Sequence, residues 1–317
     1  MKAVFLDYAT MGPELDLTAL REQFTELELF DDTADSDIGV RIKDAEFVFT
    51  NKIRLTRALL SGTTKLRFIG LTATGTDNID LSTARQHGIA VANIRAYCTQ
   101  SVVEHVMGTL LMLSHSLGRY DAAVKRGDWQ KADQFCMLTY PIRQLSGMTL
   151  GIVGYGSLGQ GVAAAARAFG MQVNAAARPG SSEVAADRVS FEQMLATSDV
   201  ISLHCPLTED TRNLFDAATI GRMKAGAILI NTARGALVDA NALVAALESG
   251  QLAGAAIDVL EQEPPVAGNA LLEYSGENLI ITPHIAWGTD QARQNAIDEL
   301  AANAAAFIGG TDRNRVE

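Results

Sequence analysis

The sequence is poor in cysteine and has no long apolar run. Its three cysteines, Cys98, Cys136 and Cys205, are far apart and form no CxxC pair, so we expect reduced, packed thiols rather than disulfides or a zinc site. The first apolar run has only four residues before Asp7, and no segment approaches the roughly 18 uninterrupted apolar residues of a membrane span. These absences predict a cytoplasmic protein.

Positive charge is also scarce. The 26 lysines and arginines stand against 37 aspartates and glutamates, which gives a formal net charge of −11 and a pI near 5.0. This balance argues against a nucleic-acid partner and against an anionic membrane surface, so a small anionic substrate must be met by local positive groups. No two histidines have HxxxH or HExxH spacing, so we expect no catalytic metal.

The most informative motif that is present is a glycine-rich turn between an apolar strand and an alanine-rich helix, in LGIVGYGSLGQGVAAAARAF at 150–169. In such a turn the first glycine allows the tight bend, the second lets the backbone approach a pyrophosphate, and the third lets the helix pack on its strand. The helix N-terminus then favours the anion through its unpaired N–H groups. The predicted dinucleotide-binding positions are Gly154, Tyr155, Gly156, Ser157, Leu158 and Gly159.

The end of the following strand, at 171–177, discriminates between cofactors. An acidic residue there binds the ribose hydroxyls of NAD, but this chain has Ala177 followed by Arg178 and then by Pro179, Gly180, Ser181 and Ser182. A guanidinium close to hydroxyls suits a phosphate monoester. We therefore expect NADP(H) to be preferred, with NAD(H) possible if Arg178 is only a solvated loop arginine.

Alternation of apolar and amphipathic segments predicts two parallel sheets. The first domain has strand-like segments at 3–6, 46–49, 66–71 and 89–92, with Asp80 and Gly88 as the expected N-cap and C-terminal stop of one helix. A long helix from Thr99 leads into the second domain, and its sheet continues after the glycine turn with strands at 200–204, 227–231, 254–258 and 278–282.

We therefore expect an α/β protein of two domains. A Rossmann doubly wound dinucleotide-binding domain occupies residues 99–287. A smaller, flavodoxin-like substrate domain, also called the catalytic domain, takes residues 1–98 and 288–317, because the final helix at 290–308 crosses back to complete it.

Three polar residues follow strands of the second domain and form a catalytic constellation. Arg234 follows the strand at 227–231, Glu263 follows the next strand, and His284 follows the last one. Arginine binds a carboxylate and polarises an adjacent carbonyl, which fits a 2-keto acid. A histidine beside a carboxylate can hold a proton near neutral pH and release it to a developing alkoxide. We therefore predict His284 as the acid and Glu263 as its orienting partner.

The ordered set TARGALVD (232–239), DVLEQEPP (258–265) and TPHIAW (282–287) resembles the D-isomer-specific 2-hydroxyacid dehydrogenase family. The resemblance spans nearly the whole chain. Within the family, VFLDYATMGPELDL at 4–17, TNKIRL at 50–55, TATGTDNIDL at 72–81 and CPLTEDTRNL at 205–214 are most similar to the glycerate dehydrogenase branch, also called hydroxypyruvate or glyoxylate reductase. Ala177 departs from the pattern of NAD-dependent members.

The resemblance implies roles for single residues. Arg234 binds the substrate carboxylate, opposite the backbone of Thr74 and Gly75, while Glu263 and His284 form the acid–base pair. Trp287 is expected at the substrate mouth or in packing. The resemblance implies further cofactor-binding positions at Cys205, Pro206, Thr211, Thr232, Ala233, Asp258 and His284. Of these, Asp258 is assigned to the nicotinamide region.

The resemblance also bears on partners and on alternative functions. Members commonly dimerise near the long aromatic segment at 129–145, so we expect a homodimer, the alternative being that this segment packs on its own subunit. We expect NAD(P)H-dependent reduction of hydroxypyruvate or glyoxylate. One alternative is a dehydrogenase of another D-2-hydroxy acid such as D-lactate, and another is a non-catalytic NAD(P)H-sensing binding protein. His87, His105 and His115 carry no predicted role, and His204 is interpreted as a satisfied core histidine rather than as a lining of the cofactor cleft.

Overall fold

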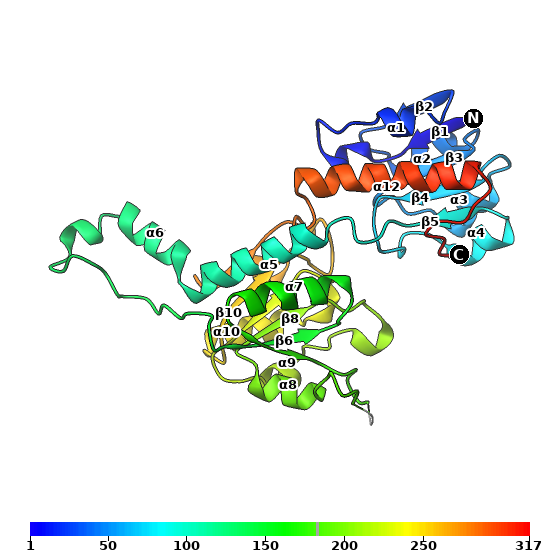
Figure 1. Cartoon of the computed structure of the whole chain (residues 1–317). Helices are drawn as coiled ribbons and strands as arrows, with labels where there is room; N and C mark the ends of the chain where they lie inside the picture. The colour runs from blue at the N-terminus through cyan, green and yellow to red at the C-terminus, as the bar shows by residue number, and fades with distance from the viewer. Residues whose placement is uncertain (182–183) are drawn as a thin grey trace. The chain divides into compact units, whose positions relative to one another are not determined.

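The computed structural model describes residues 1–181 and 184–317 and consists of two compact units (Figure 1). Unit 1 comprises Met1–Cys98 and Gly288–Glu317, and unit 2 comprises Thr99–Trp287. Both are α/β structures with parallel sheets, as the fold class predicted from the sequence requires. Within the described residues, no helix is both long enough and apolar enough to cross a membrane.

Unit 1 is built on a five-stranded parallel sheet with the order β2-β1-β3-β4-β5. This is the order of a flavodoxin-like sheet, the fold class predicted for this domain. One strand, β2, was not anticipated: it reads ELEL, lies at the edge of the sheet, and none of its residues is fully buried. The strands are β1 (Lys2–Phe5), β2 (Glu26–Leu29), β3 (Phe47–Thr50), β4 (Phe68–Leu71) and β5 (Ala90–Ala92).

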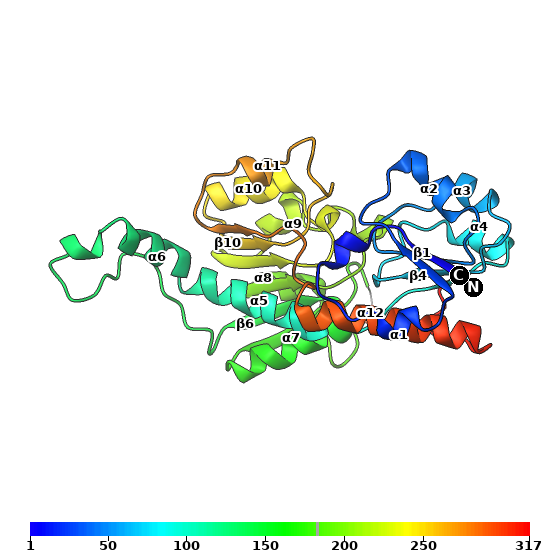
Figure 2. The same cartoon turned by 90° about the horizontal axis from the view of Figure 1, so that it is seen from above.

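The two faces of this sheet carry different side chains because neighbours along a strand point to opposite sides. The aliphatic face is covered by α2, α3 and α4, and the aromatic face by α1 and α12 (Figure 2). On the aromatic face Phe307 of α12 packs on Phe47 and Phe68, with ring centroids 5.7 and 5.0 Å away. The helices are α1 (Thr18–Arg21), α2 (Asp35–Ile42), α3 (Arg57–Ser61), α4 (Leu81–Gln86) and α12 (Asp290–Ile308), with a 3₁₀ turn, η1 (Tyr8–Met11).

Two helix boundaries of unit 1 agree with the sequence. The Asp80 carboxylate accepts the backbone N–H of Thr83 at 2.9 Å, which is the predicted N-cap of α4, and Gly88 follows that helix with a φ of 68°. The last helix, α12, spans the expected range and belongs to unit 1.

Unit 2 is built on a six-stranded parallel sheet with the order β11-β10-β9-β8-β6-β7. A single parallel bridge between Ala176 and Val189 extends it beyond β7. When that bridge is counted as a further strand, the sheet has the strand order of a doubly wound Rossmann fold. From β6 the chain adds strands toward one edge of the sheet, and from β8 onward it adds them toward the other edge. The strands are β6 (Thr149–Val153), β7 (Gln172–Ala175), β8 (Val200–Leu203), β9 (Ala227–Asn231), β10 (Leu252–Ile257) and β11 (Leu279–Ile281).

Helices cover both faces of the unit 2 sheet. On one side α5 and α7 pack together, and on the other side α8 and α9 belong to a core with α10 and α11 (Figure 1). The helices are α5 (Thr99–Ser114), α6 (Leu117–Lys125), α7 (Ser157–Ala168), α8 (Phe191–Thr197), α9 (Ala217–Gly221), α10 (Ala240–Glu248) and α11 (Ala270–Glu273), with 3₁₀ turns η2 (Trp129–Lys131), η3 (Glu209–Thr211) and η4 (Gly235–Leu237).

Candidate active site

The glycine turn joins β6 to α7 at the point where the strand order reverses. Gly154 has a φ of 92°, and a Cβ there would lie 2.5 Å from the Cys205 nitrogen and 2.6 Å from the His204 carbonyl oxygen. A Cβ at Gly159 would overlap the carbonyl oxygen of Gly154. Both positions therefore require glycine for the backbone to close against the end of β8 and for α7 to pack on its own strand.

Gly156 is different, and it gives a test of whether the turn fits a dinucleotide. A Cβ built on it would meet nothing within 4 Å. It is also the N-cap of α7, a twelve-residue helix whose first turn receives no side-chain cap. Open space in front of uncapped helical N–H groups is what a diphosphate requires, so the residues present fit the predicted cofactor.

Two orphaned polar atoms lie at the ends of the next strands. Nδ1 of His204, after β8, and Oγ1 of Thr232, after β9, are buried without a hydrogen-bond partner. The other ring nitrogen of His204 lies 2.8 Å from the Ser202 hydroxyl, so the interpretation as a fully satisfied core histidine is wrong for one of its two nitrogens. Burial lowers the pKa of His204 to about 4 and leaves the ring neutral near pH 7.

The neighbouring cofactor candidates are held mainly by local contacts. The Thr211 hydroxyl donates to the Pro206 carbonyl at 2.8 Å, and burial raises the pKa of the Cys205 thiol, which keeps it protonated. The Tyr155 carbonyl accepts the Gln160 side chain, while Ser157 and Leu158 open α7.

Arg178 stands directly after the Ala176–Val189 bridge. It is exposed, and its carbonyl accepts the N–H of Ser181 at 3.1 Å. With Pro179 and Gly180 at the two central positions and a φ of 73° at the glycine, residues 178–181 form a type II turn. The structure therefore presents Arg178 at the start of a stiff turn. Ser182, a further hydroxyl of the predicted phosphate site, lies outside the described residues.

Arg234 is placed by a buried asparagine that the sequence did not single out. Asn231, the last residue of β9, accepts the Ala233 N–H at 3.0 Å and donates to the Arg234 carbonyl at 2.8 Å. The guanidinium also donates to the Ala233 carbonyl at 2.8 Å. An asparagine at a strand end before a turn is the only sequence signal for this clamp.

Glu263 and His284 form a direct pair. Oε2 of Glu263 lies 2.5 Å from Nδ1 of His284, and its Oε1 accepts the backbone N–H of Leu260 at 2.8 Å. An ionised carboxylate only accepts, so Nδ1 of His284 carries the proton of this bond. The ring is therefore held with Nε2 as the nitrogen that is available to a substrate.

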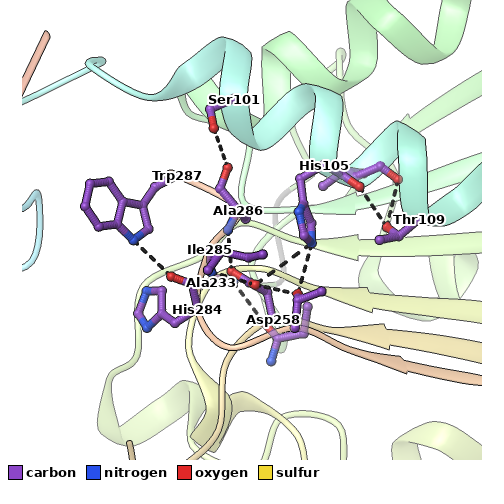
Figure 3. Close-up of polar contacts among 12 residues, drawn as sticks. Ser101, His105, Thr109, Ala233, Asp258, His284, Ile285, Ala286 and Trp287 are labelled. Carbon is purple, nitrogen blue, oxygen red and sulfur yellow. Dashed lines mark hydrogen bonds and ion pairs between the residues drawn. The ribbon is translucent and has the colours of Figure 1, made fainter. Parts of the chain in front are cut away.

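The loop that carries His284 is held by Asp258 (Figure 3). His284 is a non-glycine residue with a φ of 57°, a conformation that neighbouring contacts must maintain. Asp258 is 2% exposed, and its Oδ1 and Oδ2 accept the N–H groups of Ile285 and Ala286, each at 2.9 Å. The expected nicotinamide contact of Asp258 stays a prediction beside this observed role.

The three predicted catalytic residues share one pocket in unit 2, with a volume of about 250 Å³. Its walls also include Leu207 after β8 and the segment at 259–261 after β10. Trp287 turns back on the same loop and donates its indole N–H to the His284 carbonyl at 3.0 Å. In such an arrangement the guanidinium can bind the carboxylate of a keto acid, and the imidazole of the neighbouring carboxylate–imidazole pair can transfer a proton to the carbonyl oxygen.

The predicted substrate residues Thr74 and Gly75 belong to unit 1. They lie in the loop after β4, where the Thr74 hydroxyl donates to the Ile94 carbonyl at 3.0 Å and the Thr74 carbonyl accepts from Asn93 at 2.7 Å. These bonds fix the loop, and its carboxylate-binding role stays a prediction.

Comparison with known proteins identifies the family. Residues 107–286 match the family model described as D-isomer specific 2-hydroxyacid dehydrogenase, NAD binding domain. The chain is also 42% identical to the glycerate dehydrogenase of Methylorubrum extorquens over 100% of this chain and 99% of that protein. The chain belongs to the D-isomer-specific 2-hydroxyacid dehydrogenase family.

Two further proteins resemble this dehydrogenase over their whole length. The hydroxypyruvate reductase of Blautia hydrogenotrophica is 37% identical over 100% of this chain and 99% of that protein. The solved structure of an acyclic imino acid reductase in complex with NADPH and D-Arg has a TM-score of 0.88 and 25% identity, covering 100% of each chain. The dehydrogenase is thus an oxidoreductase with a nicotinamide cofactor, and the alternative of a non-catalytic binding protein is not supported.

The glycine turn of the dehydrogenase generates a paired prediction. Gly156→Ala should change the free energy of unfolding by less than about 1 kcal/mol, the usual cost of losing a good N-cap, because its Cβ meets open space. It should weaken NADPH binding about 10-fold or more, since the methyl group enters the space for the diphosphate. Gly159→Ala should cost about 2 to 3 kcal/mol of stability, because its Cβ overlaps backbone.

Urea unfolding and fluorescence titration with NADPH measure these two quantities. Unaltered NADPH affinity in Gly156→Ala would show that the diphosphate lies elsewhere. A fully stable Gly159→Ala would contradict the close packing of α7 on β6.

Proposed function

We propose that this enzyme reduces hydroxypyruvate or glyoxylate with NADPH, and in reverse oxidises D-glycerate or glycolate. The observation that carries the proposal is the contact of 2.5 Å between Glu263 and His284 in the pocket that Arg234 lines. The choice of substrate is supported by relatives named glycerate dehydrogenase and hydroxypyruvate reductase, which match this chain over its whole length.

In the proposed mechanism Arg234 binds the substrate carboxylate through its planar fork and orients the adjacent carbonyl. When bound, the nicotinamide supplies the hydride in the reductive direction. The reductive direction starts from the imidazolium form of His284, and as negative charge develops on the carbonyl oxygen, Nε2 gives it a proton and leaves the neutral ring protonated on Nδ1. Glu263 keeps Nδ1 occupied and stabilises the imidazolium that the reverse reaction forms.

Residues outside the pocket of unit 2 complete the proposal. The backbone at Thr74 and Gly75 binds the other side of the substrate carboxylate, and Trp287 limits the size of the substrate side chain. The cofactor-binding set is the glycine turn together with the strand-end residues Cys205, Pro206, Thr211, Thr232, Ala233 and Asp258. We place the enzyme in the cytoplasm, where its three free cysteines stay reduced, and its acidic charge argues against nucleic-acid or membrane partners.

The decisive measurement is the initial rate of NADPH oxidation at 340 nm with hydroxypyruvate. His284→Ala should lower kcat by about 10²- to 10⁴-fold, the usual worth of general acid–base catalysis, while NADPH affinity stays within about twofold. Glu263→Gln should lower kcat less, because the amide can still orient the ring.

His87→Ala is the matched control, since that histidine is exposed at the end of α4 in unit 1. Wild-type turnover by His284→Ala would refute the assignment of the acid. Turnover of pyruvate in place of hydroxypyruvate would favour D-lactate as the product.

We further propose that Arg178 makes NADPH the preferred cofactor. Three observations support this preference: the strand β7 is followed by alanines rather than by an acid, Arg178 is exposed, and a type II turn fixes its backbone. A guanidinium that binds the 2′-phosphate of NADPH makes a charge-assisted contact, whereas NADH has no group for it.

Arg178→Gln should raise the KM for NADPH about 10- to 100-fold, corresponding to a lost charge-assisted bond, and change the KM for NADH by less than about twofold. Arg85→Gln, at an exposed arginine of α4, is the control. Steady-state kinetics with both cofactors decide the matter. A wild-type enzyme that prefers NADH would overturn the proposal.

We also propose that the enzyme is a homodimer that buries the segment at 129–145. Four apolar side chains of this segment are strongly exposed: Trp129 51%, Phe135 89%, Leu138 77% and Ile142 51%. Figures 1 and 2 show α6 and the chain after it extending away from the unit 2 sheet, and the segment returns to its own unit at its end, where Arg143 donates to the Gly226 carbonyl and Leu145 is buried. An exposed apolar arm of this size is typical of a subunit interface.

Sedimentation equilibrium should give twice the 33.8 kDa chain mass for the wild type. The double variant Phe135→Ser and Leu138→Ser should sediment as a monomer at micromolar concentration, because the interface loses its most exposed apolar anchors. Val40→Ser removes a side chain that is 78% exposed in unit 1 and should leave the dimer intact. A monomeric wild type would refute the proposal.

A further inference from the structure

Helix α5 contacts the catalytic loop at two points that lie one helical turn apart (Figure 3). The Ser101 hydroxyl donates to the Ala286 carbonyl at 2.7 Å. Nε2 of His105 lies 3.2 Å from the Thr282 hydroxyl and 3.9 Å from Oδ1 of Asp258. Residues four apart share one face of a helix, so α5 presents Ser101 and His105 together to the loop. The two contacts lie on either side of His284 in the sequence.

The directions of these hydrogen bonds follow from the donor and acceptor inventory. The Thr282 hydroxyl lies 2.5 Å from Oδ1 of Asp258 and donates its only proton to that carboxylate. The hydroxyl must then accept from His105, so the proton of the ring lies on Nε2. A continuous chain therefore runs from His105 through Thr282 to Asp258, which in turn holds the N–H groups of Ile285 and Ala286.

The loop needs this support because of its backbone conformation. A non-glycine residue in the left-handed region, as His284 is with a φ of 57°, is less stable than in the right-handed region by about 1 to 2 kcal/mol. Such a conformation persists only where neighbouring contacts over-determine it. If the loop relaxed, the His284 ring would move away from Oε2 of Glu263, and its proton-donating nitrogen would turn from the substrate.

We propose that Ser101 and His105 are positioning residues that hold the His284 loop in its catalytic conformation. This inference rests on the proposed function, since it assigns the two residues to the proton-transfer step of that reaction. They act through the backbone of the loop and through Asp258. A merely structural role would alter stability and leave turnover of the folded enzyme unchanged.

The test uses variants of the full-length enzyme at the two points of contact. His105→Leu removes the ring donor, His105→Gln keeps an N–H donor on a side chain of similar reach, and Ser101→Ala removes the hydroxyl. Thr109→Val is the matched control, because the buried Thr109 hydroxyl donates back to carbonyls of its own helix α5, those of His105 and Val106.

We expect kcat with hydroxypyruvate to fall about 10- to 100-fold in His105→Leu, as for a slightly misplaced catalytic group, with KM for NADPH within about twofold. The kcat of Ser101→Ala should also fall, His105→Gln should recover most of the kcat lost in His105→Leu, and Thr109→Val should have the kcat of the wild type. Hydrogen exchange of the Ile285 and Ala286 amides should become about 10-fold faster in His105→Leu and Ser101→Ala.

The two readouts separate this inference from the proposed function. Unchanged exchange, or faster exchange with unchanged kcat, would overturn the positioning role. If the wild type does not reduce hydroxypyruvate, the proposed substrate is wrong, and kcat is then measured with the 2-keto acid that the enzyme does reduce. If His105→Leu fails to fold, His105→Gln and Ser101→Ala carry the same comparison.

Discussion

The carboxylate of Asp258 lies buried at the carboxyl end of β10 and accepts two backbone N–H groups and one hydroxyl from the loop that carries His284. An ionised group at this depth is costly unless each oxygen is hydrogen-bonded, so the carboxylate and the loop stabilise each other. An asparagine would turn an amide donor toward these same donors. The position of the proposed acid therefore depends on a negative charge at the end of β10, which β9 and β8 separate from β6, the strand of the glycine turn.

The rest of the site follows from the parallel sheet. Neighbouring strands β9, β10 and β11 end at the same edge and deliver Arg234, Glu263 and His284, respectively, into one pocket. The strands β6 and β8 end beside them and carry the glycine turn and His204. A sheet with hydrogen-bonded strands is a rigid base, so local contacts suffice to place the residues that follow β9 and β10, such as those of Asn231 for Arg234 and of Leu260 for Glu263.

Apolar periodicity was enough to predict the strands of both sheets apart from β2, and the strand-end positions of Arg234, Glu263 and His284 were enough to expect these three residues close together, as they are in one pocket. The strand β2 was missed because its ELEL sequence is half-buried at a sheet edge and lacks a continuous apolar run. The contacts of Ser101 and His105 could not be predicted either, since their partners lie 185 and 177 positions further along the chain. Sequence shows that they share a helical face but not what that face meets. The unsatisfied nitrogen of His204 likewise depends on tertiary burial.

The discontinuity of unit 1 has a consequence for biosynthesis. Unit 2 is a continuous stretch of chain, complete once residue 287 has been made, whereas unit 1 needs α12 from the end of the sequence. Until then Phe47 and Phe68 lack the ring of Phe307 that covers them, and an aromatic sheet face stays open to water. Domains fold as units during translation, so unit 2 should mature first although it begins later. The nascent first hundred residues are then the aggregation-prone part of the chain, and truncation before α12 would leave the aromatic face of their sheet without the cover of that helix.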